Sequence, residues 1–300
     1  MNNMPAEHIP VLSEFVAGIS LKENAVVVDA TIGCGGHSRI FAQSLGKDAV
    51  LLGLDVDNDC LAITRKNLAT LSCKVLLVRE NFANIADVMR QNGIEKADLI
   101  FADLGVCSVQ LADKSKGLSF NDDMKLDMRL DDRLKLSAAE IVNSMDEKGL
   151  ADLIYNFGQE RASRKIARSI ILYRQKKKIG STAELVNIIC KALKCSPTSR
   201  KSRIHPATKT FQALRIAVNS ELENLEKFLA VVPNLLNKNG KIAVISFHSL
   251  EDRIVKTNFR QNKTGGVYEI VTKKPVTASS AEQRENPRCR SAKLRMAVKL

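Results

Sequence analysis

Short apolar runs alternate with amphipathic segments over the first hundred residues of the chain. The apolar runs have the length of strands and are rich in valine, leucine and isoleucine: 26–28, 50–54, 74–78 and 97–103. Between them, segments 58–71 and 83–93 repeat apolar residues at helical spacing. This alternation predicts a parallel sheet covered by helices.

The alternation stops after Leu104, and residues 137–194 predict helices only. Two capping boxes, Ser137 to Glu140 and Ser181 to Glu184, mark helix starts in this stretch. A long apolar stripe from Phe211 to Val232 follows, and strand patterns resume at 241–246, 267–272 and 292–300. We therefore expect an α/β sheet domain formed by residues 1–110 and 208–300, with a helical domain inserted at 111–207.

A glycine-rich loop joins the first predicted strand to a helix. It runs from Asp29 to Ser38, and the second predicted strand ends on Asp55. A strand, a glycine loop, a helix and a strand tipped with an acid are typical of nucleoside-binding sites, where the acid holds the ribose. The alternative is a tight turn that binds nothing.

The glycine spacing argues against a dinucleotide. Gly33 and Gly35 are present, but Ser38 stands where a pyrophosphate-binding turn has Gly or Ala. Asp29 would also repel a pyrophosphate. The loop therefore favours a nucleoside without phosphate, such as S-adenosylmethionine, and makes an NAD-dependent oxidoreductase the weaker alternative.

Charge is distributed unevenly along the chain. Residues 1–110 carry nine Lys/Arg against thirteen Asp/Glu, whereas residues 111–207 carry twenty against twelve and residues 208–300 seventeen against eight. A slightly acidic cofactor half beside a basic remainder predicts a polyanionic partner such as RNA. A solvated lysine-rich surface, or a non-enzymatic RNA-binding protein with a vestigial cofactor fold, remains an alternative.

Other sequence features limit the functional classes. No apolar run is long enough to cross a membrane, and residues 1–7 lack a signal-peptide profile, so we expect a cytoplasmic protein. Seven cysteines occur at no zinc-like spacing, and we expect free thiols and no metal.

A basic face is expected on the helix predicted near residue 165. It is formed by Arg161, Arg164, Lys165 and Arg168. This face is either a solvated surface or a contact for RNA.

Polar and aromatic residues follow several predicted strands. Phe82 comes after the third, Asp103 ends the fourth, and His248 and Ser249 follow the fifth. Each has a structural alternative: Phe82 as a core residue, Asp103 and Ser249 as helix caps, and His248 as a structural histidine. Because parallel strands end at one edge of a sheet, their convergence favours a site.

Motifs spread over the whole chain resemble one known family. They are His8–Leu12, Asp29–Ser38, Phe101–Gly105, Leu126–Arg129, His205–Thr208, Phe211–Ile216, Ser246–Arg253 and Asn286–Arg295. In order and spacing they resemble the bacterial 16S ribosomal RNA cytosine-N4 methyltransferases, known as MraW or RsmH. The stretch Ser246–Arg253 is the most specific of these motifs.

The resemblance implies a Rossmann-like, S-adenosylmethionine-dependent methyltransferase with an inserted helical domain. The implied substrate is a cytosine in the decoding region of 16S rRNA, presented on the small ribosomal subunit. The residues that match the family's cofactor-binding positions are Gly35, Gly36, His37, Asp55, Phe82, Asp103 and Gln110, to which the loop adds Gly33. The chain departs from the family pattern at Cys107, Val109, Ala112, Met124 and Lys125.

Two residues are candidates for the chemistry and eight for RNA binding. Asp103 and His248 are the residues we expect at the reacting amine, as hydrogen-bond acceptor or orienting group. The expected RNA contacts are Arg129, His205, Lys209, Arg253, Arg288, Arg290, Lys293 and Arg295.

Overall fold

The computed structural model describes residues 10–120, 122–196 and 205–300, so His8 and Ile9 of the first motif lie outside the described residues. The chain divides into two compact units. The sheet unit comprises Met1–Cys107 and Leu222–Leu300, and the helical unit comprises Ser108–Glu221.

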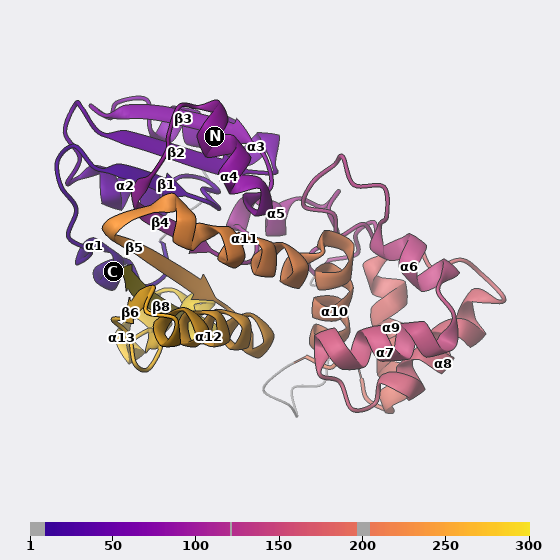
Figure 1. Ribbon diagram of the computed structural model, residues 1–300. Helices are drawn as coiled ribbons and strands as arrows, with labels where there is room; N and C mark the ends of the chain where they lie inside the picture. Colours follow the sequence, from indigo (N-terminus) through magenta and orange to yellow (C-terminus); the bar gives the residue numbers. More distant parts are fainter. Residues whose placement is uncertain (1–9, 121, 197–204) are drawn as a thin grey trace. The chain divides into compact units, whose positions relative to one another are not determined.

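The sheet unit contains one mixed sheet in the order β3-β2-β1-β4-β5-β8-β6, with β7 paired to β8 (Figure 1). Strands β1 to β5 are parallel, and β8 is antiparallel to β5, β6 and β7. The strands are β1 (Val26–Asp29), β2 (Val50–Asp55), β3 (Lys74–Arg79), β4 (Ala97–Asp103), β5 (Leu236–Ser246), β6 (Tyr268–Ile270), β7 (Val276–Thr277) and β8 (Lys293–Lys299). This confirms the α/β sheet that the alternating pattern predicts and the Rossmann-like fold that the resemblance implies.

Helices cover both faces of this sheet because successive strand residues point to opposite sides. Val27 and Leu51 pack on one face with residues of α1, α2 and α3, whereas Val28 and Leu52 pack on the other with α4, α11 and α12. The helical segments are α1 (Ser13–Ala17), α2 (Gly36–Ala42), α3 (Asn58–Asn67), α4 (Ile85–Gln91), α11 (Glu221–Leu235), α12 (Ser249–Thr264), α13 (Ser280–Glu285) and the 3-10 turns η1 (Phe82–Asn84) and η2 (Pro287–Ser291).

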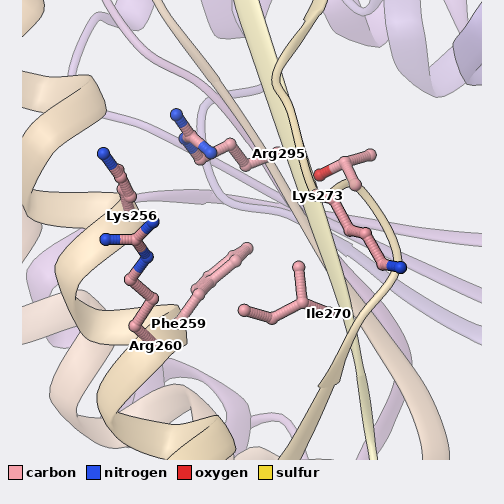
Figure 2. Close-up of a pocket in the computed structure, with 7 residues that line it drawn as sticks. Lys256, Phe259, Arg260, Ile270, Lys273 and Arg295 are labelled. Atoms are coloured by element: carbon pink, nitrogen blue, oxygen red, sulfur yellow. The ribbon is translucent and has the colours of Figure 1, made fainter.

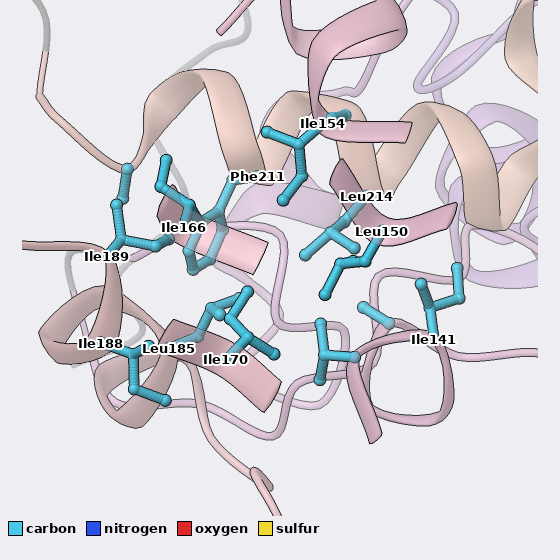
Figure 3. Close-up of a cluster of buried hydrophobic side chains, with 14 of the residues drawn as sticks. Ile141, Leu150, Ile154, Ile166, Ile170, Leu185, Ile188, Ile189, Phe211 and Leu214 are labelled. Atoms are coloured by element: carbon cyan, nitrogen blue, oxygen red, sulfur yellow. The ribbon is translucent and has the colours of Figure 1, made fainter. Parts of the chain in front are cut away.

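The helical unit encloses its own apolar core, to which five helices contribute (Figure 3). Both predicted capping boxes form, with the Ser137 and Ser181 side chains accepting from the backbone N–H groups of Glu140 and Glu184. The helices are α5 (Ser108–Ala112), α6 (Ala138–Ser144), α7 (Glu147–Gly158), α8 (Ser163–Arg174), α9 (Thr182–Leu193) and α10 (Thr208–Asn219). No helix among the described residues is long and apolar enough to cross a membrane.

The structure corrects the expected boundary of the insertion at residue 207. The apolar stripe from Phe211 to Val232 is not one helix, because Ser220 adopts a left-handed conformation with φ 49° and ends α10. Phe211 and Leu214 pack in the core of the helical unit, whereas Leu225 and Leu229 pack against the sheet. A repeat of apolar residues predicts helical spacing but not which core each turn joins.

Candidate active site

Three carboxylates gather at the carboxyl edge of the sheet. Asp29, Asp55 and Asp103 are the last residues of β1, β2 and β4, which are neighbouring parallel strands. Parallel strands present their carboxyl ends at one edge, and ligands of open α/β sheets bind there. The described residues include no Lys or Arg in an ion pair with any of the three.

The glycine loop is fixed beside Asp55 by its own backbone. Gly33 has φ 52° and Gly35 φ 83°, conformations that favour glycine. The Gly33 N–H donates to Asp55 Oδ2 at 2.9 Å, while the Thr64 hydroxyl donates to the Gly33 carbonyl at 2.5 Å. The other Asp55 oxygen accepts from the N–H of Asp57 at 2.8 Å. These hydrogen bonds therefore fix the glycine loop, Asp55 at the end of β2 and helix α3 relative to one another.

Burial raises the pKa of two of these carboxyls to values near neutrality. The pKa of Asp55 rises to about 7, chiefly because the group is desolvated. The pKa of Asp29 rises to about 6 for the same reason, although its side chain accepts from the Ser38 hydroxyl at 2.7 Å. Asp29 is 1% exposed, which makes it a group that orders the loop rather than one that reaches a ligand.

Asp103 has one engaged and one open oxygen. Its Oδ2 lies 3.5 Å from His37 Nδ1, and the other ring nitrogen of His37 lies 2.8 Å from the carbonyl of Val11. Asp103 Oδ1 is buried and has no hydrogen-bond partner among the described residues. Desolvation, and then the nearby Asp29 and Glu251, raises the pKa of Asp103 well above its usual range. A buried acceptor without a partner marks the place where a ligand group is missing.

These features fit S-adenosylmethionine better than a dinucleotide. The edge presents carboxylates and the N–H groups of glycines that adopt positive φ. Its carboxylates pair with no Lys or Arg among the described residues that could bind a pyrophosphate. A cofactor that carries a sulfonium and an ammonium group would offset the cost of burying these carboxylates away from water, which is the main cause of their raised pKa values.

The sequence profile of the MraW methylase family matches residues 5–300. The chain belongs to the MraW methylase family. It is an S-adenosylmethionine-dependent methyltransferase, which excludes the NAD-dependent oxidoreductase and the vestigial RNA-binding protein considered above.

Full-length relatives agree with this assignment. A protein of Acidobacterium capsulatum named ribosomal RNA small subunit methyltransferase H is 42% identical, with 97% of this chain and 98% of the relative covered. A protein of Cyanothece with the same name is 45% identical, with 98% and 95% covered. An rRNA methylase structure from Streptococcus thermophilus is 12% identical, with 96% and 93% covered and a TM-score of 0.44. The assignment rests on the family match and the relatives, not on this structural likeness.

The remaining cofactor candidates of the methylase fall in both units. Phe82 is half-buried in η1, with its ring edge-on to Phe228 at 5.5 Å. Gly36 begins α2, the helix that carries His37. Gln110 lies buried on α5 in the helical unit.

His248, and not the cap candidate Ser249, occupies the N-cap of α12, which gives His248 a structural role. Its Nδ1 accepts from the Glu251 N–H at 3.4 Å, and Glu251 bonds back to the backbone N–H groups of Phe247 and His248. Its Nε2 lies 3.2 Å from Glu251 Oε1. The side chain thus orders the turn after β5, and its proposed contact with the target base stays a prediction.

Five of the eight RNA candidates have side chains engaged within the protein. Arg129 donates to both oxygens of Asp127 and to the Leu134 carbonyl, and Arg295 donates to both oxygens of Asp252. His205 stacks on Phe120, and Lys209 donates to the Gln159 carbonyl. The half-buried Lys293 has its Nζ 3.8 Å from Asp252 Oδ2, and the other three, Arg253, Arg288 and Arg290, are exposed. The stripe of Arg161, Arg164, Lys165 and Arg168 is exposed as well.

A basic hollow lies on the sheet unit between α12 and β8, and sequence reasoning missed most of it. It is lined by Lys256, Phe259, Arg260, Ile270, Thr272, Lys273 and Arg295. Figure 2 shows Lys256, Phe259 and Arg260 extending from α12, with Ile270 facing Phe259 and with Arg295 nearby. The i, i+4 spacing of Lys256 and Arg260 was readable from the sequence, but the fold is needed to bring them into one hollow with Lys273.

Proposed function

We propose that this methylase transfers the methyl group of S-adenosylmethionine to the exocyclic N4 amine of a cytosine in small-subunit ribosomal RNA, acting on the small ribosomal subunit. The names of the relatives support small-subunit ribosomal RNA as the substrate. The family motifs along the chain support cytosine as the base and N4 as the methylated atom. The single observation in the site that supports amine chemistry is the open, buried Oδ1 of Asp103.

S-adenosylmethionine supplies a methyl group on a cationic sulfonium, already activated for displacement. The protein's task is therefore to orient the acceptor opposite the carbon–sulfur bond. The N4 lone pair of cytosine is delocalised into the ring and is a weak nucleophile. Asp103 Oδ1 would accept a hydrogen bond from the amine, favour its pyramidal form and hold the departing proton.

Each residue at the carboxyl edge is proposed to contact a different part of the cofactor or to position a residue that does. Asp55 is positioned to bind the ribose hydroxyls, because its oxygens are already ordered by two backbone N–H groups. Gly33, Gly35 and Gly36 let the backbone approach closely, His37 orients Asp103, and Phe82 offers a ring face or edge to the adenine. Gln110, the last of the proposed cofactor residues, lies buried on α5.

The RNA surface we propose uses the exposed cations rather than the engaged ones. Arg253, Arg288 and Arg290 and the basic hollow contribute phosphate contacts, whereas Arg129 and Arg295 act mainly by ordering their own loops and strands. Loss of charge at Arg288 and Arg290 should weaken subunit binding and reduce its salt dependence. An unchanged salt slope would remove both from the surface.

Methyl transfer from labelled cofactor tests the proposal directly. Purified small subunits, naked 16S RNA and DNA are incubated with the enzyme and labelled S-adenosylmethionine, and the modified nucleotide is mapped. We expect label in subunits, on N4 of one cytosine, and none with Asp103→Ala. Label on another base, or on DNA as efficiently as on subunits, would refute the assignment.

A further inference from the structure

Three cysteines from distant parts of the sheet unit meet next to the glycine loop. Cys34 lies within that loop, Cys60 on α3, and Cys107 four residues after the end of β4. Their three sulfur atoms all lie within 4.8 Å of one another, and the Sγ atoms of Cys60 and Cys107 are 3.3 Å apart. The sequence separations of 26 and 47 residues match no metal motif, so the cluster is visible only in the fold.

The spacing of the sulfurs suits a single soft cation. A zinc–thiolate bond of about 2.3 Å with tetrahedral angles places neighbouring sulfurs about 3.8 Å apart. The range of 3.3 to 4.8 Å in the protein brackets that value, so small rotations of the side chains would complete a three-sulfur set. A disulfide would use two of these cysteines and leave the third unexplained.

The surroundings of the cluster also suit a cation. Cys60 is buried, whereas Cys34 and Cys107 are half-buried, so the cluster is closed on the side of Cys60 and partly open to solvent at the other two thiols. Asp55 and Asp57 lie close enough to interact electrostatically with the Cys34 thiol, and Asp55 also with Cys107. Negative charge at this distance favours a bound cation.

We propose that Cys34, Cys60 and Cys107 form a binding site for one thiophilic cation of the zinc class. Binding forms three metal–sulfur bonds and releases the thiol protons to solvent, with no change of oxidation state. It ties the glycine loop to α3 and to the segment after β4. Since Gly33 donates to Asp55, the cation would fix the loop in the geometry that holds the ribose acid.

Titration of the reduced, cofactor-free protein with Cd²⁺ tests the site without reference to methyl transfer. We expect one equivalent to bind with thiolate-to-metal absorption in the ultraviolet. Cys107→Ser and Cys60→Ser should weaken binding at least roughly tenfold and reduce the absorption. Cys73→Ser, a buried thiol of the same unit outside the cluster, is the matched control and should bind like the parent. Circular dichroism confirms that each variant is folded.

Two results would overturn the proposal. One is Cd²⁺ binding whose absorption is the same in the parent, Cys60→Ser and Cys107→Ser. The other is no binding by the reduced parent together with a Cys60–Cys107 disulfide after mild oxidation, detected by peptide mass spectrometry, which would identify a redox pair instead. Either failure leaves the methyl-transfer proposal intact, because that proposal rests on Asp103 and the RNA product.

Discussion

The sheet unit concentrates opposite charges in two places, the carboxyl edge and the basic hollow. At the edge, Asp29, Asp55 and Asp103 have no Lys or Arg partner among the described residues. In the hollow, Lys256, Arg260 and Lys273 have no acidic partner among them either. Both arrangements carry an electrostatic cost in the free protein, which a ligand of opposite charge would relieve. The sheet unit thus offers separate places for a cationic cofactor and for the proposed RNA substrate.

The two regions should also respond differently to salt. The acids of the edge are largely buried, so dissolved ions screen them little, whereas Arg260 and Lys273 are exposed and fully screened. We therefore expect cofactor affinity to change little with salt and RNA affinity to change strongly. The predictions below separate the regions on this basis.

The largest effect is expected from Asp103→Asn. The variant keeps the shape of the side chain but loses a carboxylate acceptor at the proposed position of the amine. Turnover with small subunits should fall about 10²- to 10³-fold, measured as labelled methyl incorporation, while affinity for subunits changes little. Asp48→Asn, an exposed acid of the same unit, is the control and should retain parent activity. Near-parent turnover of Asp103→Asn would remove Asp103 from the chemistry.

Asp55→Ala should weaken the cofactor rather than the RNA. The variant loses the proposed ribose contact and the acceptor of the Gly33 and Asp57 N–H groups. We expect the Kd for S-adenosylhomocysteine, measured by calorimetry, to rise roughly 10- to 100-fold, because a hydrogen bond to a charged group contributes about 1.5–3 kcal/mol. Since the pKa of Asp55 is about 7, the parent's affinity should also fall as the pH drops below 7. If the affinity of Asp55→Asn fell in the same way below pH 7, the pH dependence would come from a group other than Asp55.

The triple variant Lys256→Gln/Arg260→Gln/Lys273→Gln should have the converse effect. Binding to small subunits should weaken, and the slope of log affinity against log salt should become shallower by up to about 2, roughly 0.7 for each lost phosphate contact. The Kd for S-adenosylhomocysteine should stay the same. Lys47→Gln/Arg65→Gln/Lys66→Gln removes three exposed cations elsewhere on the unit and should leave the slope unchanged. Equal slopes in the two triple variants would exclude the hollow as an RNA surface.

The difference between the regions also explains what the sequence could reveal. The edge was predictable because each acid ends its own strand and the loop glycines lie within one short segment. The hollow and the cysteine cluster were not, since Lys273 approaches α12, and Cys34 meets Cys60 and Cys107, only after the strands pair. The boundary at Ser220 was missed for a related reason. Helix ends are recognised in a sequence mainly by glycine or proline, and the left-handed residue here is a serine. The apolar positions of α10 and α11 therefore form one continuous stripe in the sequence.

The smallest effect, and the one that probes the edge without any ligand, is expected from Ser38→Ala. The pKa of Asp29 is raised to about 6, so between pH 3.8 and 6 the folded state binds more protons than the unfolded state, and the free energy of unfolding falls as pH rises. The Ser38 hydroxyl limits this fall by donating to the carboxylate.

Removing that hydroxyl should therefore destabilise the ionised form more than the protonated one. In denaturant unfolding we expect Ser38→Ala to lower the free energy of unfolding by about 2 kcal/mol at pH 8 and by about 1 kcal/mol at pH 5. Titration of Asp55 in the same window contributes to parent and variant alike and cancels in the difference. Ser44→Ala, at an exposed position, should show neither loss. An equal loss at both pH values would mean that Asp29 has the same protonation state at pH 5 and pH 8, and would contradict a pKa near 6 for this carboxyl.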